Sequence, residues 1–146
     1  MKIFISGSAN IDTIPTSILN MIDKSVEKYP EALFLVGDCR GTDAAIQNHL
    51  SKKNYKFNVY YSGNAPRNCS TTATAQINVN ATGKYGRDFY TQKDIQMTKD
   101  CDVCIAIWDG KSKGTEANIN RAITENKTII VYRTDNNKLY KHTPVT

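Results

Sequence analysis

The segment Val103 to Ile123 reads VCIAIWDGKSKGTEANINRAI, an apolar run that passes through a glycine-bracketed polar turn into a helix-patterned stretch. A second segment, Ala32 to Ile46 (ALFLVGDCRGTDAAI), has the same order. Each places Gly-Thr where a buried strand would meet a helix N-terminus, whose free N–H groups and positive dipole end suit an anion. Open parallel sheets bind ligands at the carboxyl ends of their strands, so we expect both turns to share one nucleotide-like ligand.

The rest of the chain continues this alternation of strands and helices. Apolar runs of strand length lie at 2–6, 32–36, 57–61, 103–108 and 128–132. Helical periodicity marks 14–26, 42–52, 88–99 and 115–125. Continuous apolar strands joined by helices predict a parallel sheet covered on both faces. We therefore expect an α/β fold, a Rossmann-like three-layer α/β/α sandwich with about five mainly parallel strands.

The 146 residues fit one domain, which we place at 1–133, with a surface tail at 134–146. The segment 62–86 is a long polar loop that breaks the rhythm. It is a disordered insert, a small surface hairpin (Gln76 to Asn80 alternates as a strand does), or a lid over the ligand.

Composition limits the classes of partner. With 40% hydrophobic residues, no apolar run near the length of a membrane span and an amino end that soon becomes polar, the chain is predicted to be cytoplasmic. The net charge of +5 suits an anionic metabolite, nucleic acid or solubility alone. Because the lysines are dispersed, with Lys52-Lys53 the one adjacent basic pair, extended nucleic-acid binding is not favoured.

Four cysteines, Cys39, Cys69, Cys101 and Cys104, do not indicate a disulfide framework in such a domain. Cys101 and Cys104 form a CxxC without a second close pair, so core packing is favoured over zinc. Cys39 is either a reactive thiol or a small residue beside the ligand. We expect no metal and no cofactor.

Candidate ligand-binding residues lie after three predicted strands and before one predicted helix. They are Ser6, Gly7 and Ser8; Gly37, Asp38, Arg40, Gly41 and Thr42; Asp109, Gly110, Ser112, Gly114 and Thr115; and Arg87. Hydroxyls and close backbone can bind phosphate or ribose, and Arg40 offers a planar fork of donors.

Each of these positions also has a purely structural interpretation. The Ser6–Ser8 stretch could be a tight turn, and Thr115 could be the N-cap of the last helix. Asp38 and Asp43 could pair with Arg40, cap the helix, or accept a ribose hydroxyl. Trp108 either stacks on a base or packs against the sheet, and Arg87 either neutralises phosphate or lies on the surface. Neither the Walker motif nor the three-glycine dinucleotide fingerprint is present.

The motifs GDCRGTD and IAIWDGKSKGTEANI resemble the SLOG superfamily, Rossmann-like relatives of the cytokinin-activating phosphoribohydrolases, with most likeness to the YspA/YpsA-related branch. The resemblance implies a nucleotide or nucleotide-derived ligand, phosphate binding at Gly114 and Thr115, and a homo-oligomer. Asn118 stands where the hydrolase pattern PGGxGTxxE has its glutamate, so hydrolase chemistry is not carried over. A weaker likeness to nucleoside deoxyribosyltransferases makes Glu116 and Asp109 the candidate catalytic acids, with Asp94 as a further carboxylate.

The leading hypothesis is therefore a protein that binds a nucleotide or ADP-ribose-like ligand at the carboxyl rim of the sheet, as a sensor, sequestering or carrier protein. The alternative is an N-glycosidic hydrolase or transferase acting on nucleoside 5′-phosphates. A third hypothesis is a DNA-associated role.

Overall fold

The computed structural model describes residues 1–144 and contains seven strands and four helices. In chain order they are β1 (Lys2–Gly7), α1 (Thr16–Lys28), β2 (Leu33–Val36), α2 (Thr42–Lys52), β3 (Lys56–Tyr61), β4 (Ala75–Asn78), α3 (Arg87–Asp100), β5 (Val103–Trp108), α4 (Lys113–Thr124), β6 (Thr128–Arg133) and β7 (Lys138–His142). The four predicted helices and the five predicted strands are all present, and each end lies within two residues of its expected position.

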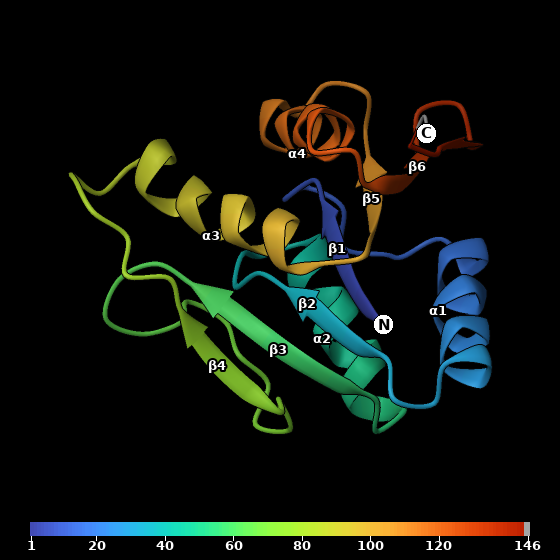
Figure 1. Cartoon of the computed structure of the whole chain (residues 1–146), viewed down its shortest axis with the longest axis horizontal. Helices are drawn as coiled ribbons and strands as arrows, with labels where there is room; N and C mark the ends of the chain where they lie inside the picture. The colour runs from blue at the N-terminus through green and yellow to red at the C-terminus, as the bar shows by residue number, and fades with distance from the viewer. Residues whose placement is uncertain (145–146) are drawn as a thin grey trace.

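One sheet runs through the molecule in the order β4-β3-β2-β1-β5-β6-β7 (Figure 1). All neighbouring strands pair in parallel except β6 and β7, which are antiparallel. The prediction of an α/β, Rossmann-like sandwich is confirmed, but the number of strands is seven rather than about five.

The two additional strands are the edges of the sheet, where an apolar run is not required. β4 lies inside the polar segment 62–86 and pairs in parallel with β3, so this segment is not a hairpin. β7 is exposed along its whole length and lies in the expected surface tail. An edge strand with a solvated face carries a weak hydrophobic signal, which explains why β7 was missed and why β4 was expected only as part of a possible surface hairpin. The last two positions of that tail, 145–146, lie outside the described residues.

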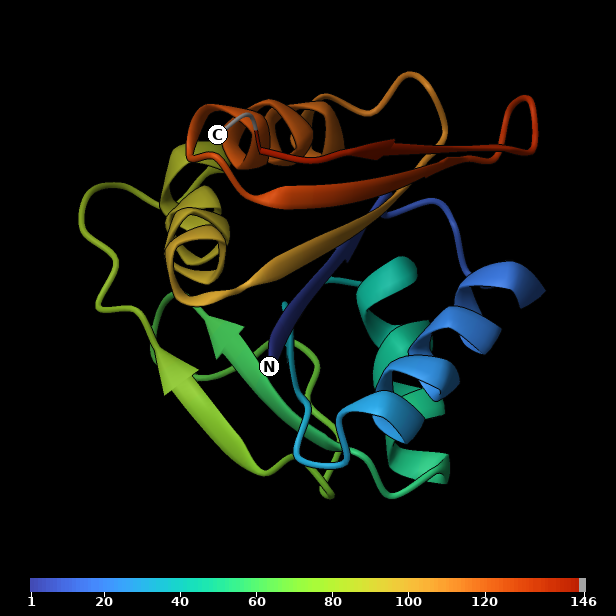
Figure 2. The ribbon, with the colours of Figure 1, turned by 45° about the vertical axis from the view of Figure 1, so that its right-hand side comes forward.

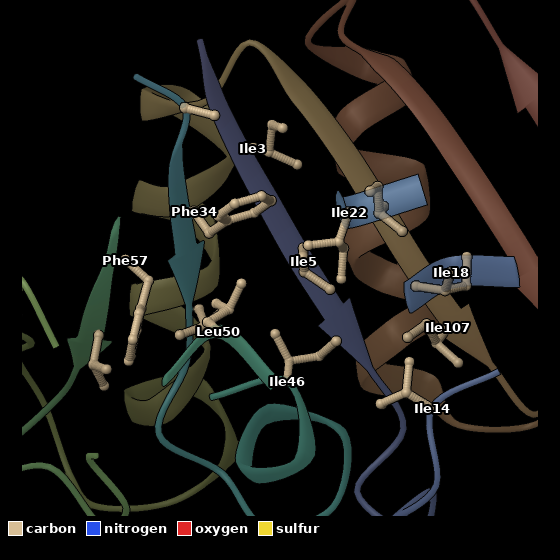
Figure 3. Packing of buried hydrophobic residues seen from close by; sticks show 14 residues of the cluster. Ile3, Ile5, Ile14, Ile18, Ile22, Phe34, Ile46, Leu50, Phe57 and Ile107 are labelled. Atoms are coloured by element: carbon tan, nitrogen blue, oxygen red, sulfur yellow. The ribbon is translucent and has the colours of Figure 1, made fainter. Parts of the chain in front are cut away.

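Helices cover both faces of the sheet, with α1 and α2 on one side and α3 and α4 on the other (Figure 2). Alternate side chains of β1 pack on opposite faces of the sheet. Ile3 and Ile5 pack with Ile18 and Ile22 of α1 and with α2 (Figure 3), whereas Phe4 packs with Met97 of α3 and Ala122 of α4. This division makes Ser6, two positions beyond Phe4, the next residue on the α3/α4 face.

The strand order places a topological switch point between β1 and β5. The chain moves outward from β1 through β2 and β3 to β4, then returns to the other side of β1 to form β5. The helices that follow β1 and β5 diverge at such a point, so a crevice opens at the carboxyl ends of these two strands.

The CxxC cysteines belong to the core beneath α3 and α4. Cys101 and Cys104 are both buried, with their Sγ atoms 3.4 Å apart, in the cluster that includes Phe4 and Met97. The preference for core packing at this pair agrees with that placement. Within residues 1–144, no helix combines the length and the apolar character needed to cross a bilayer.

Ile22 tests the core on the α1/α2 face because its side chain is fully buried. We expect Ile22→Ala to lower the free energy of unfolding by about 2–5 kcal/mol, through lost burial and the cavity left behind. The matched control, Ile95→Ala, removes the same atoms from a residue that is 37% exposed and should cost far less. Urea unfolding measures both, and equal losses would contradict this description of the core.

Candidate functional site

A cavity of about 450 Å³ occupies the crevice at the switch point. Its floor is the carboxyl end of β1, and its walls come from α3, from the first turns of α4 and from the loop and first turn of α2. Four cationic side chains and two carboxylates line it. They are Arg67, Arg87, Lys93 and Lys113, and Asp43 and Asp94. The wall therefore carries a formal excess of positive charge.

The turn after β5 is organised by Asp109. Its Oδ1 accepts hydrogen bonds from the backbone N–H groups of Lys111 (2.9 Å) and Ser112 (2.7 Å), and its Oδ2 accepts one from the Ser112 hydroxyl (2.9 Å). Burial alone would raise the pKa of Asp109, but these donors lower it far below its ordinary value. Asp109 is thus a permanent anion that shapes the loop.

This loop presents the N-terminus of α4 to the cavity. The helix begins at Lys113, two residues earlier than expected, with Ser112 at the N-cap and no side-chain cap hydrogen bond. The prediction of Thr115 as N-cap is wrong, because Thr115 already lies in the first helical turn. The backbone N–H groups of Lys113, Gly114 and Thr115 donate to no group of residues 1–144 and are available to an anion.

Buried polar side chains surround these free N–H groups. Thr115 is 3% exposed and Ser6 is 7% exposed, and neither hydroxyl has a hydrogen-bond partner among the described residues. The carboxamide oxygen of Asn118 accepts from Arg121, while its NH₂ group has no such partner. Because these side chains line the cavity, their polar atoms can bind a polar ligand or water there.

The end of β1 is tied to both neighbouring turns. The Ser8 hydroxyl accepts the N–H of Asp109 at 3.3 Å, and the Thr42 hydroxyl donates to the carbonyl oxygen of Ser8 at 2.8 Å. Gly7 is required because a Cβ there would overlap the side chain of Thr42. Gly41, with φ of +75°, allows the same close approach of α2 to Ala9. These residues of the first turn therefore hold the crevice together.

Asp38, at the end of β2, is fully buried and is neutralised from the long polar segment. Arg67 donates to it from the backbone N–H (2.8 Å), Nε (3.3 Å) and Nη2 (2.8 Å). The guanidinium also lies 4.1 Å from the centre of the Tyr90 ring. Asp38 does not pair with Arg40, which is exposed, and the polar segment reaches the cavity through Arg67.

Half of the predicted ligand-binding residues line the cavity and half do not. Those that line it are Ser6, Gly7, Ser8, Arg87, Ser112, Gly114 and Thr115. Those outside the lining are Gly37, Asp38, Arg40, Gly41, Thr42, Asp109 and Gly110. Glu116 is also outside it, 4.0 Å from Lys113. Trp108 is half-buried and packs against the core, and its Nε1 donates to the carbonyl oxygen of Ser112 (3.0 Å).

Sequence reasoning named Arg87 and Asp94 of α3 but missed Tyr90 and Lys93 of the same helix, which also line the wall. Lys93 is only 5% exposed, and it lies four residues from Phe89 and from Met97, both buried. A lysine in phase with two apolar residues on one helix face is a sequence signal that would have pointed to it.

Comparison with known proteins supports the fold. No protein-family model and no curated protein matches the chain. The molybdenum cofactor binding protein from the phototrophic bacterium Rippkaea orientalis is similar in structure, with a TM-score of 0.66, 16% identity, and 89% of this chain and 74% of that chain covered. TM1055, a structural-genomics target, has a TM-score of 0.62 and 18% identity, with 91% of this chain and 74% of that chain covered.

At these identities the likeness shows the fold alone. The protein is a Rossmann-like α/β protein with a crevice at its switch point.

The ion pair between Asp38 and Arg67 is expected to stabilise the folded protein. We expect Arg67→Ala to lower the free energy of unfolding by about 2–4 kcal/mol, because it leaves a buried carboxylate without its partner. The control Lys56→Ala removes an exposed ion pair with Glu31 and should cost at most about 1 kcal/mol. If chemical denaturation shows equal losses of unfolding free energy in the two variants, the buried pair does not stabilise the protein more than the exposed pair.

The ionisation of Asp43 is expected to make the stability of the protein depend on pH. Burial raises its pKa from 3.8 to about 6, although Lys93 opposes the shift. The folded protein therefore holds this proton more tightly than the unfolded chain, so its contribution to stability is present below pH 4 and is lost as pH rises through 6. Relative to wild type, Asp43→Asn should gain on the order of 2 kcal/mol between pH 4 and pH 7. Urea titrations at several pH values measure this difference, and a constant difference would contradict the shift.

Proposed function

We propose that the protein is a SLOG-like binding protein for a nucleotide or nucleotide-derived ligand, which it senses, sequesters or carries. The ligand occupies the crevice at the carboxyl ends of β1 and β5, with a phosphate at the N-terminus of α4.

The observation that carries this proposal is the free N-terminal turn of α4 within a cationic cavity. Three N–H groups that donate to no group within residues 1–144, together with the positive end of the helix dipole, favour a phosphate group there. The hydroxyls of Ser6 and Thr115 line the same cavity and add donors. Arg87 and Lys113 supply charge from the two helices that flank the opening.

The size of the cavity agrees with a small organic ligand. A volume of about 450 Å³ lies within the range of about 300–1,000 Å³ usual for such sites. The similar protein from Rippkaea orientalis is a molybdenum cofactor binding protein, so a protein of this fold has a precedent as a ligand binder. Binding by the present chain is inferred from its own cavity.

The geometry favours binding over N-glycosidic cleavage by the expected acids. Both carboxylate oxygens of Asp109 are engaged within its own loop, and Glu116 does not line the cavity. A general acid must reach the reacting atom directly or through one water. Neither residue is placed to do so at a ligand bound in this cavity.

The test is a panel of nucleoside mono- and diphosphates, ADP-ribose and inorganic phosphate, with thermal shift as the measurement and mass spectrometry on each mixture. We expect a phosphate-bearing compound to raise Tm and to be recovered intact. Lys113→Ala should weaken its affinity about three- to tenfold, from lost attraction to the phosphate. The control Lys52→Ala removes the same charge from an exposed residue of α2 and should leave the affinity for this compound unchanged. A released base would indicate an enzyme instead, and no response to any compound would refute the proposal.

A further inference from the structure

A second polar cluster lies in the wall of the same cavity, formed by Asp43 of α2 and by Lys93 and Asp94 of α3. Asp43 and Lys93 are 8% and 5% exposed. Three ionisable side chains from two helices thus meet at a place with little exposure to solvent. Such an arrangement is costly unless the charges are paired and hydrogen-bonded.

Lys93 and Asp94 are adjacent in the sequence, yet both side chains reach the cavity. The Nζ atom of Lys93 donates to Oδ1 of Asp94 at 2.9 Å. Neighbouring residues on a helix point about 100° apart and do not ordinarily face each other. The ion pair therefore draws the two side chains together at the surface of the cavity.

Asp43 approaches this pair across Gly37. A Cβ on Gly37 would lie 2.6 Å from Oδ2 of Asp43 and 3.0 Å from Nζ of Lys93. The absence of a side chain at position 37 is what lets the carboxylate and the ammonium group lie so near the end of β2. The N–H of Cys39, which also lines the cavity, donates to the same Oδ2 at 3.1 Å.

The cluster has hydrogen-bonding capacity that the protein does not use. Within residues 1–144, Lys93 makes one hydrogen bond with its three donors, and neither Oδ1 of Asp43 nor Oδ2 of Asp94 accepts any. Asp38, which is also buried, differs because Arg67 satisfies both of its oxygens. The contrast indicates that the open capacity of the cluster is directed at something in the cavity.

The cluster of Asp43, Lys93 and Asp94 has the chemistry to bind hydroxyl groups. A hydroxyl accepts from an ammonium group and donates to a carboxylate at the same time, so neighbouring hydroxyls complement a cluster that has both. A second phosphate would be repelled by the two carboxylates. We propose that Asp43, Lys93 and Asp94 form a sugar subsite, and that the ligand is a phosphate ester of a ribose rather than of a deoxyribose. This inference rests on the proposed function, because it assigns the end of the ligand that the α4 site leaves free.

The experiment compares ribose 5-phosphate, 2-deoxyribose 5-phosphate and inorganic phosphate by isothermal titration calorimetry on the wild-type protein. Loss of one hydroxyl that bonds to charged groups should weaken binding about tenfold or more. Ribose 5-phosphate should therefore bind at least about tenfold more tightly than its deoxy counterpart. Because this comparison uses the unmodified chain, it does not depend on the folding of any variant.

Variants then assign the preference to the cluster. Asp94→Asn and Asp43→Asn should each reduce the ratio of ribose to deoxyribose affinity to below about threefold. The affinity for inorganic phosphate should not fall, because each change removes a negative charge from the cavity. The matched control is Asp88→Asn, the same change at an exposed position in the first turn of α3, outside the cavity lining. Thermal unfolding of each variant verifies that it is folded.

The possible outcomes separate the two proposals. Equal binding of the two sugar phosphates, or equal weakening of all three probes by Asp94→Asn, would overturn the sugar subsite and leave the phosphate site standing. No binding of any of the three probes would overturn the phosphate site as well. A ribose preference that only the cluster variants abolish would support both.

Discussion

Parallel pairing of β1 with β5 is the constraint on which the site depends. The register sets Ser6 opposite Ala106 and Gly7 opposite Ile107, so the two strands end side by side. The N–H of Ser8 donates to the carbonyl oxygen of Ile107 at 3.0 Å, which extends this pairing into the turns. A shift of one residue would turn Ser6 away from the α3/α4 face. The crevice exists because the register brings two unrelated loops together.

Charge is buried beside and within this crevice in two different ways. Arg67 donates hydrogen bonds to both oxygens of the buried Asp38 carboxylate. The pair therefore holds the long polar segment against the sheet. At Asp43 and Lys93 the charges are buried, and among residues 1–144 they make fewer hydrogen bonds than their donors and acceptors allow. A burial penalty that is not fully offset within the protein is typical of functional sites rather than of structural ion pairs.

Sequence and structure agree best where one element alone determines the outcome. Ser6 to Ser8, at the end of a predicted strand, and Gly114 and Thr115, at the start of a predicted helix, line the cavity because each lies beside an element with a clear apolar pattern. Arg40 was chosen by the same logic but is exposed, since the short turn carries it away from the crevice. Arg67 had no local signal, because only the folded path of a long polar segment brings it to Asp38.

The α/β class, the four helices and the five central strands follow from the order of residues alone, because buried strands and helices need apolar side chains at regular spacing. The pairing of the two edge strands, which need little apolar surface, and the composition of the cavity wall follow from the folded arrangement. Lys93, Asp43 and Arg67 lie far apart in the chain and meet through strand order and helix packing. Such contacts depend on the whole arrangement of the sheet, which no local pattern encodes.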